Sequence, residues 1–518
     1  MKDISSTGSF IDFTLENFIY VDKTEYIPKI VKLKRVFISR PRRFGKSLTL
    51  DTIATLFETG VEPYFKGTWI YDKWTEPTYS VLRLNFLNLD NFSIDDFKNK
   101  LNSYITEFAN KIGVKEYAEK KEPEDSIDSM LEKLREEKRQ IVILIDEYDY
   151  QLTSNINNEE LYKQFQKELQ NIYNNLKDKW AIKFLLITGV TKTKNSSVFS
   201  GTDINDITNY SPYSQMIGFT RDEIKKYYID YLKLAASYEN NCAVDEITDD
   251  KLESMFDKLE EQYGGYCFDE DYEKKVFNTW SVNDFFQSVV SNKFVYFGEY
   301  WYDNGGLPSI LVNYLKTHEL NIFEYLDKDK FLKVSSDDFK NPTALTTINQ
   351  NVLMCQTGYL TLRSDLNKTS TVALGIPNGE IYKALNRLLA NNIFKGNTDI
   401  TDDYGRSLLE VGTVDDIINL FNSALNSVSY DNYPIVSESS VQNMLKLYLL
   451  GAHQKVLSEV HEAKGRADLV VNTDNRRIVF EFKYAKNEAE AKSKLSEAVE
   501  QIKTRDYGNI LPKKNELI

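Results

Sequence analysis

The stretch that decides the fold is residues 35–60, RVFISRPRRFGKSLTLDTIATLFETG. Residues 35–40 are largely apolar and β-branched, which predicts a strand, and the segment from Lys46 repeats apolar residues at helical spacing until Gly60. Gly45, Lys46 and Ser47 end the loop between them. A strand that feeds a tight loop and then a helix turns backbone N–H groups toward phosphate oxygens. The sequence therefore predicts a nucleotide site at this loop.

The loop departs from the usual pattern at Arg40, which stands where such a loop normally carries its first glycine, and Pro41 stiffens the same entry. In this reading Lys46 reaches the β- and γ-phosphates of ATP, and Ser47 binds Mg²⁺. Arg42 and Arg43 either add charge to the phosphate site or face solvent. We predict that the whole loop contacts the nucleotide: Arg40, Pro41, Arg42, Arg43, Phe44, Gly45, Lys46 and Ser47.

A second strand supports the nucleotide site. IVILIDEYD (141–149) is a buried-strand pattern that ends in Asp146 and Glu147. Ligands bind at the carboxyl edge of an open α/β sheet, where Asp146 can hold the Mg²⁺ and Glu147 can orient or deprotonate water. The alternative is that two acids merely end a strand or cap a helix. Thr188, at the end of AIKFLLITGV (181–190), is a candidate γ-phosphate sensor, although a threonine leaving a strand more often only makes a turn.

The chain alternates strand and helix patterns over its first 220 residues, with YSVLRLNFL (79–87) as a strand and 125–140 and 158–177 as helices. This alternation predicts an α/β fold with a parallel sheet covered on both faces. Residues 220–425 are helix-rich and aromatic, and from about 435 a helix, a strand, a hairpin and a helix follow. We expect three domains, at 1–220, 221–425 and 426–518.

Composition narrows the class of protein. The net charge of −14 argues against constitutive coating of nucleic acid, although residues 31–50 hold seven basic residues and no acidic one. Three cysteines and three histidines in 518 residues disfavour a disulfide framework and a zinc site. No signal pattern opens the chain, and no apolar run is long enough to span a bilayer. We expect a soluble cytoplasmic protein without a membrane partner.

The stretch GRADLVVNTDNRRIVFEFKYAK (465–486) is the second informative one. It reads as two strands around a turn centred between Asp474 and Asn475, which places Asp468 opposite Glu481. Lys483 then projects from the same face as Glu481. Two carboxylates can hold Mg²⁺, which activates water, and the lysine positions that water or the developing charge. The alternative is an exposed hairpin face with an ordinary Glu/Lys pair, and spacing alone leaves the two about even.

The chain resembles the AAA-ATPase-like family of bacterial and archaeal proteins. The resemblance is carried by FIYVDKTEYIPKIV, RPRRFGKS, ILIDEYD, LLITGVTKTKNSSVFSGTDINDIT and GFTRDEI, and continues through YGGYCF, VFNTWSVNDFF, YWYDNGG, CQTGYLTL and LGIPNGEIY. The family usually carries RPRRFGKS as its own phosphate-loop variant, so Arg40 is what the resemblance leads us to expect. It further implies a helical lid and a winged-helix-like region after the ATPase domain.

The C-terminal residues resemble the PD-(D/E)XK nuclease module, a small α/β restriction-endonuclease-like domain that accompanies this ATPase-like domain. By position, Asp468, Glu481 and Lys483 match its core acids and lysine, and Gln501 its trailing helix residue. Glu459 matches an upstream acid. Either Glu459 or Glu438 can complete the metal shell, and we prefer Glu459 slightly.

These readings predict an ATPase that controls a Mg²⁺-dependent nuclease, with Mn²⁺ as an alternative metal. Its partner is nucleic acid, with DNA preferred, and a homo-oligomer is expected because hydrolysis in many such ATPases needs an arginine from a neighbour. The basic run or Arg221 is a candidate for that arginine. The resemblance suggests roles around mobile elements or defence. The alternative is an ATP-dependent switch whose C-terminal module binds nucleic acid without cutting it or is inactive.

Overall fold

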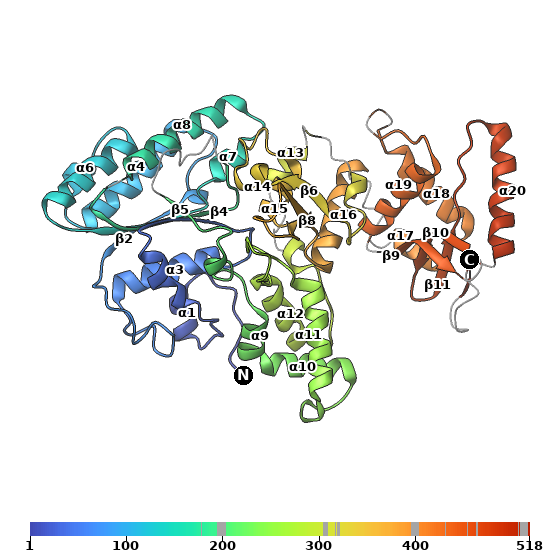
Figure 1. Cartoon of the computed structure of the whole chain (residues 1–518), viewed down its shortest axis with the longest axis horizontal. Coiled ribbons are helices and arrows are strands. Elements are labelled where there is room, and N and C mark those ends of the chain that lie inside the picture. The colour runs from blue at the N-terminus through green and yellow to red at the C-terminus, as the bar shows by residue number, and fades with distance from the viewer. Residues whose placement is uncertain are drawn as a thin grey trace. The chain divides into compact units, whose positions relative to one another are not determined.

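The structure is a computed structural model of the whole chain (Figure 1). It describes residues 1–177, 179–193, 204–303, 309–315, 318, 322–394, 404–429, 431, 433–452, 454–462, 465–505, 507 and 516–517. Parts of two sequence motifs therefore lie outside the described residues: 194–203 of LLITGVTKTKNSSVFSGTDINDIT and 304–306 of YWYDNGG.

A five-stranded parallel sheet forms the centre of the N-terminal part. Its order is β2-β3-β4-β1-β5, and each neighbouring pair runs parallel. The central strands β1 and β3 are buried along their whole length, as expected for a sheet covered on both faces. The predicted parallel sheet is confirmed. Its strands are β1 (Arg35–Ser39), β2 (Ser80–Asn85), β3 (Ile141–Asp146), β4 (Ile182–Gly189) and β5 (Asn205–Asp206).

Helices cover both faces of this sheet. Figure 1 shows α4, α6 and α8 on one side and α1 and α3 on the other. In α6 the buried residues Ile127, Met130, Leu131 and Leu134 recur at helical spacing, so one stripe of the helix faces the core. The helices are α1 (Phe10–Leu15), α2 (Ile27–Val31), α3 (Lys46–Thr59), α4 (Ile94–Lys111), α5 (Lys115–Ala118), α6 (Pro123–Glu136), α7 (Tyr150–Ser154) and α8 (Glu159–Asn175).

A helical region with an aromatic core follows. Thr220 and Glu223 form a capping box that starts the first of these helices. Tyr228 stacks on Phe286 with ring centroids 5.3 Å apart, and both rings are almost fully buried. The predicted helix-rich, aromatic region is thereby confirmed. Its helices are α9 (Arg221–Tyr227), α10 (Ile229–Asn240), α11 (Asp249–Tyr263) and α12 (Thr279–Asn292).

A small antiparallel sheet of order β6-β8-β7 lies in the second half of this region. The sequence patterns did not predict these strands, because the longest of them has only five residues and such runs show no clear alternation. The elements are α13 (Ser309–Leu315), β6 (Leu332–Ser335), α14 (Ser336–Lys340), α15 (Gln350–Thr357), β7 (Thr361–Leu362), β8 (Thr371–Gly375) and α16 (Gly379–Ile393).

The C-terminal module has the predicted sequence of helix, strand, hairpin and helix. Its sheet has the order β12-β11-β10-β9, with β9, β10 and β11 antiparallel. Helices α17 (Tyr404–Val411) and α18 (Val414–Asn426) precede the module, whose own elements are α19 (Glu438–Gly451), β9 (Lys455–Glu462), β10 (Gly465–Asn472), β11 (Arg476–Phe480), α20 (Glu488–Arg505) and β12 (Glu516–Leu517).

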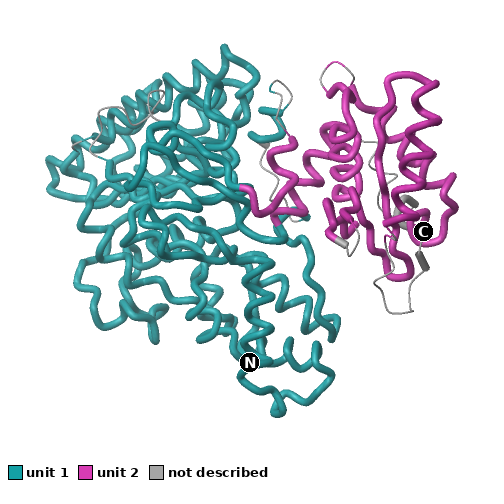
Figure 2. Tube along the Cα trace, turned by 45° about the vertical axis from the view of Figure 1, so that its right-hand side comes forward, with its two compact units in different colours: residues 1–318, 331–380 teal, residues 319–330, 381–518 magenta. Residues whose placement is uncertain are grey.

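The chain divides into two compact units, coloured separately in Figure 2. Unit 1 comprises residues 1–318 and 331–380, and unit 2 comprises 319–330 and 381–518. The boundaries of the two units differ from residues 220 and 425, and the division into three domains at those residues stays a prediction. Among the described residues, no helix has the length and apolar character needed to cross a membrane.

Candidate functional site

The phosphate-binding loop joins β1 to α3 in unit 1. Arg43 has φ 71° and Gly45 has φ 96°, whereas Phe44 between them does not have a positive φ. Left-handed residues set among right-handed ones make a concave run of backbone N–H groups, which favours anions. Helix α3 begins at Lys46, so its positive N-terminal end opens on the same loop. The local geometry is suited to an anion, and nucleotide binding at this loop stays a prediction.

Lys46 lies folded against its own loop. Its Nζ donates to the carbonyl oxygens of Arg40 (3.1 Å) and Pro41 (3.2 Å) and lies 3.7 Å from Oε1 of Glu147. The side chain is 4% exposed, so the ammonium group is held in place by these oxygens rather than by water. A phosphate group arriving at the loop would offer Lys46 stronger, charged acceptors than these carbonyls.

Asp146 is the meeting point of three chain segments. Ser47 Oγ donates to its Oδ2 at 2.6 Å, and Thr188 Oγ1 donates to its Oδ1 at 2.6 Å. These residues stand at the start of α3 and at the ends of β3 and β4. The carboxyl edge of the sheet therefore brings Ser47, Asp146 and Thr188 together, as the sequence predicted.

Glu147 follows Asp146 at the same edge. It has φ 51°, a left-handed conformation that is uncommon for glutamate, and its N–H donates to Asp146 Oδ1 at 3.0 Å. Burial raises the pKa of Glu147, and the nearby Lys46 opposes that rise. A carboxyl group in such a place is suited to accept a proton from water near the phosphates.

The side chain of Arg40 is buried and has a structural role. It is 1% exposed, and its guanidinium donates to the carbonyl oxygens of Ser39, Thr208 and Ser214. It also lies 4.2 Å from the ring centroid of Phe268, and burial lowers the pKa of Arg40 to about 9. Only its backbone carbonyl, which binds Lys46, belongs to the loop's inner surface. The side chain of Arg40 thus binds other parts of the protein, and its contact with a nucleotide stays a prediction.

The other loop residues are anchored to the helical region of unit 1. Phe44 is 1% exposed and packs edge-on against Tyr266 and Phe268. The guanidinium of Arg43 lies 3.9 Å from the ring centroid of Trp280. Arg43 therefore does not simply face solvent, which was one of the two readings of the basic run.

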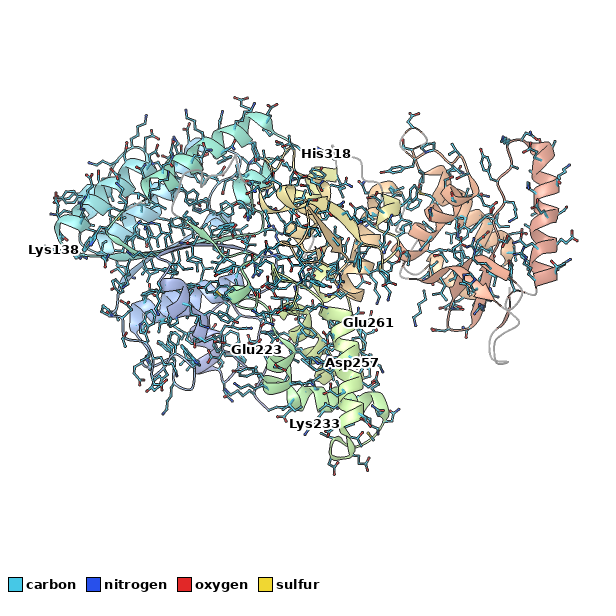
Figure 3. The ribbon with its side chains drawn as sticks, in the orientation of Figure 1. Lys138, Glu223, Lys233, Asp257, Glu261 and His318 are labelled. Atoms are coloured by element: carbon cyan, nitrogen blue, oxygen red, sulfur yellow. The ribbon has the colours of Figure 1, made fainter. Side chains whose placement is uncertain are left out.

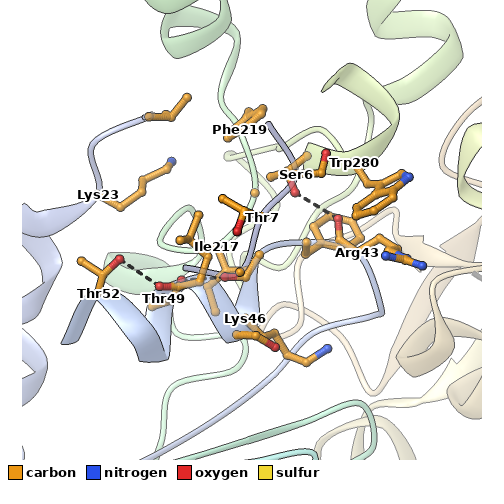
Figure 4. Close-up of a pocket in the computed structure, with 18 of the residues that line it drawn as sticks. Ser6, Thr7, Lys23, Arg43, Lys46, Thr49, Thr52, Ile217, Phe219 and Trp280 are labelled. Atoms are coloured by element: carbon orange, nitrogen blue, oxygen red, sulfur yellow. Dashed lines mark hydrogen bonds between the residues drawn. The ribbon is translucent and has the colours of Figure 1, made fainter. Parts of the chain in front are cut away.

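A cavity of about 430 Å³ opens from the loop (Figure 4). The loop and the sheet edge contribute Gly45, Lys46, Ser47 and Glu147 to its lining. Apolar lining residues come from the N-terminal segment and the start of the helical region: Phe13, Ile19, Val21, Ile27, Ile217 and Phe219. No sequence pattern singles out these apolar residues, since isolated apolar side chains read as ordinary core positions.

Arg221 is held within its own unit. It pairs with Glu253 (2.8 Å), Asp257 (3.0 Å) and Glu260 on α11, where Asp257 is labelled in Figure 3. Three carboxylates on one guanidinium make it a poor candidate for an arginine offered to a neighbouring subunit.

The C-terminal hairpin has the predicted register. Leu469 pairs with Phe480 and Asn472 with Arg477, so Asp468 and Glu481 are the next two residues in register, just beyond the end of the ladder. The strand β11 ends at Phe480. Two residues later the Phe482 N–H donates to a side-chain oxygen, Asp468 Oδ2, at 2.8 Å, and not to a backbone carbonyl of β10. A side chain thus replaces the ladder at the point where the carboxylates meet.

Lys483 lies among oxygen atoms. Its Nζ is 2.7 Å from Glu481 Oε1, 3.1 Å from the Phe482 carbonyl oxygen and 3.7 Å from Glu438 Oε1. Burial acts to lower the pKa of Lys483, but the hydrogen bond and charge of Glu481, with Glu438 and Asp468, outweigh it and raise the pKa. Glu481 Oε2 is buried and has no hydrogen-bond partner. The position favours a cation.

Helix α19 lays a row of polar residues over this sheet. Glu438 faces Lys483, and one turn later Gln442 donates to Glu459 Oε1 (3.3 Å) and to the Asp468 carbonyl oxygen (2.7 Å). Glu459 also pairs with Arg466. Glu438 therefore lies beside Lys483, whereas Glu459 is held by Gln442 and Arg466. Which of the two acids completes a metal shell stays a prediction.

Gln501 on α20 takes a supporting position. Its Nε2 donates to the Tyr507 hydroxyl at 3.3 Å, and that hydroxyl donates to the Arg466 carbonyl oxygen at 2.7 Å. This links α20 to β10 beside the hairpin. Within the described ranges no group of three or more His, Cys, Asp and Glu residues has the arrangement of a metal site.

Two family models match the chain. Residues 5–199 match the family described as a predicted AAA-ATPase, and residues 436–518 match the PD-(D/E)XK nuclease superfamily. The chain carries an AAA-ATPase-like domain and a PD-(D/E)XK nuclease-like domain. Both families inferred from the sequence are confirmed. The first match contains the whole phosphate loop with Asp146 and Thr188, and the second contains every candidate residue of the hairpin site.

Two further comparisons found similar proteins, and neither indicates an activity. An uncharacterized protein in the vnfD 5' region of Azotobacter chroococcum mcd 1 is 25% identical over 507 residues, which cover 95% of this chain and 90% of that one. The solved structure of Cdc6p from Pyrobaculum aerophilum aligns with 71% of this chain and 93% of its own at 10% identity, with a TM-score of 0.23. A score that low supports no conclusion about this chain.

Proposed function

We propose that this protein binds and hydrolyses Mg²⁺-ATP in the AAA-ATPase-like domain and that the nucleotide controls a Mg²⁺-dependent nuclease in the C-terminal module. The observation that carries the ATPase half is the convergence of Ser47 and Thr188 on Asp146, each at 2.6 Å, beside the buried Lys46. A hydroxyl and a carboxylate at a helix N-terminus suit a phosphate-bound Mg²⁺. The adjoining cavity has apolar lining residues suited to a base.

The residues fit the chemistry of ATP hydrolysis. The loop N–H groups and Lys46 would bind the phosphates, and Ser47 and Asp146 would hold the Mg²⁺ shell. Glu147, whose pKa is raised by burial, would orient the attacking water and accept its proton. Thr188 would contact the γ-phosphate once its bond to Asp146 is exchanged.

The hairpin residues fit a divalent metal. Asp468 and Glu481 would be the ligands, and the buried Glu481 Oε2, which has no hydrogen-bond partner, suits a bond to a metal. Burial raises the pKa of Glu481, and Asp468 and Glu438 add to that rise, so a second cation beside Lys483 would relieve a real cost. The bound metal supplies activated water and charge stabilisation at phosphorus. Lys483 would position that water, and nucleic acid, with DNA preferred, would be the substrate.

A second candidate function is an ATP-dependent switch whose C-terminal module does not cut. Two observations favour it. The Lys483 ammonium already neutralises Glu481, and no metal cluster of three such residues is present in the part of the chain that the structure describes. In that case the C-terminal module would bind nucleic acid without cleaving it.

The test is cleavage of plasmid, single-stranded DNA and RNA with Mg²⁺ or Mn²⁺, with and without ATP. We expect both Asp468→Ala and Lys46→Ala to abolish cleavage, because in this proposal the bound nucleotide controls the nuclease. Loss of cleavage in Asp468→Ala alone would mean a nuclease that works without the ATPase. Cleavage that survives Asp468→Ala would refute the hairpin site, and binding without cleavage by the unaltered protein would favour the switch.

A further inference from the structure

The phosphate loop accepts hydrogen bonds on two of its carbonyl groups from the helical region, whose Thr279 and Trp280 also line the cavity. The indole Nε1–H of Trp301 donates to the Arg42 carbonyl oxygen at 3.3 Å. The Thr279 hydroxyl (3.0 Å) and the Trp280 N–H (3.3 Å) both donate to the Arg43 carbonyl oxygen. These donors come from the helical region of unit 1, more than 230 residues further along the chain. We call Thr279, Trp280 and Trp301 the carbonyl clamp.

The carbonyl clamp sets the direction of the loop's N–H groups. A planar trans peptide points its C=O and the following N–H to opposite sides. Because the Arg42 carbonyl points to Trp301, the Arg43 N–H points away from Trp301. The Arg43 carbonyl likewise turns the Phe44 N–H away from Thr279. This arrangement also holds Arg43 at φ 71°, a conformation that costs energy outside glycine.

Trp301 is itself firmly positioned. It is 0% exposed, its ring packs edge-on against Tyr359 at 5.2 Å, and its backbone N–H donates to Glu380 Oε1 at 2.8 Å. Ser281 Oγ binds the other oxygen of Glu380 at 2.8 Å. Gly358 supports the same arrangement, since a Cβ there would lie 2.9 Å from Pro41 Cβ. Trp301 does not line the cavity, so its effect on a ligand must pass through Arg42.

We propose that Trp301 and Thr279 are positioning residues of the nucleotide site: by binding the Arg42 and Arg43 carbonyls, they turn the Arg43 and Phe44 N–H groups toward the phosphate chain. This inference rests on the proposed ATP site. The positive φ of Arg43 is one that glycine adopts freely, whereas here hydrogen bonds from the helical region support it in an arginine.

The test uses substitutions that remove only the donor. Trp301→Phe keeps a buried aromatic ring but loses the indole N–H, and Thr279→Val keeps the shape but loses the hydroxyl. We expect each to weaken Mg²⁺-ATP binding to the full-length protein by about 5-fold, the effect of one hydrogen bond, in a fluorescence titration. Thr279→Ser retains the donor and should bind ATP more tightly than Thr279→Val.

Tyr359→Phe is the matched control for Trp301→Phe. It removes a buried hydroxyl that has no hydrogen-bond partner from the ring that touches Trp301, so it perturbs the same core without touching the loop. We expect unchanged ATP affinity. Wild-type affinity in both Trp301→Phe and Thr279→Val would overturn the inference, as would equal losses in Thr279→Ser and Thr279→Val. If the unaltered protein does not bind ATP, the proposed ATP site fails instead.

Discussion

At the scale of single residues, burial and neighbouring charges distinguish the charged groups of the two candidate sites. Lys46 lies among oxygens that a polyanion would replace, and Lys483 lies among oxygens that a metal would share; both side chains are largely buried. Glu147 and Glu481 share a pKa raised by burial. Paired groups with perturbed pKa values in a polar site are typical of functional positions. The two candidate sites thus show the same electrostatic pattern in separate units.

Glu147 gives the sharpest test of hydrolysis. We expect Glu147→Gln to lower the ATP turnover rate by about 100-fold or more, since a positioned base contributes roughly 10²–10⁴-fold. ATP affinity should stay within a few-fold, because the amide keeps the shape of the side chain. The measurement is steady-state phosphate release beside an ATP titration. Glu159→Gln, an exposed change on α8, is the control, and turnover that persists in Glu147→Gln would remove Glu147 from the mechanism.

Glu380 predicts a dependence of stability on pH. Burial raises the pKa of Glu380 to about 8, opposed by its bonds to Trp301 and Ser281 and supported by the charges of Glu299 and Asp284. The protonated form also solves a hydrogen-bond conflict: Ser281 Oγ lies near acceptors on both Glu380 (2.8 Å) and Asn278 (3.3 Å), but has only one proton to give.

The sign follows from proton binding. Between about pH 4.5 and 8 the folded protein holds a proton on Glu380 that the unfolded chain releases, so this contribution to stability is full below pH 4.5 and is lost as the pH rises to 8. We expect the melting temperature of Glu380→Gln to fall less steeply from pH 5 to pH 8 than that of the unaltered protein. Parallel curves would mean that Glu380 is ionised throughout.

At the scale of elements, α19 determines which acids surround the hairpin site. Glu438, Gln442 and Lys446 recur every four residues, so one face of α19 lies along β9 and β10. Gln442 binds the Asp468 carbonyl, and Lys446 Nζ donates to Ser458 Oγ at 2.9 Å. The helix thereby carries Glu438 to Lys483 and leaves Glu459 to Gln442 and Arg466.

This geometry predicts different effects of the two candidate acids. We expect Glu438→Ala to reduce the cleavage rate by roughly 10–100-fold, the usual effect of losing a group that holds or orients a metal ligand. Glu459→Ala should cost less than 10-fold, since its carboxylate pairs with Arg466. Cleavage rates at several Mg²⁺ concentrations distinguish the two. The opposite order would restore Glu459 as the acid that completes the metal shell.

At the scale of the whole molecule, the chain consists of two compact units, each with one candidate site. Units with separate cores often unfold separately. ATP should therefore stabilise only the unit that contains the phosphate loop. Metal binding at the hairpin should act on the other.

Calorimetry tests this separation. We expect two unfolding transitions, of which Mg²⁺-ATP at 100 times its dissociation constant raises one by about 3–8 °C, from roughly 2.7 kcal/mol of binding energy. Lys46→Ala should lose this shift, whereas Asp468→Ala should retain it. A single transition that moves as a whole would show that the two units unfold cooperatively.

The sequence by itself determined the elements and the short-range sites. Hydrophobic periodicity predicted β1, β3, β4 and α3, and a two-residue turn predicted that Asp468 faces Glu481, because strand and helix periods and hairpin registers depend on neighbours in the chain. Only the tertiary structure decided what depends on distant neighbours. It buries Arg40 among carbonyls, binds the loop to Trp301 and Thr279, and brings Glu438 rather than Glu459 to Lys483. These contacts join residues tens to hundreds of positions apart, and no local pattern records which side chain the packed core will place beside another.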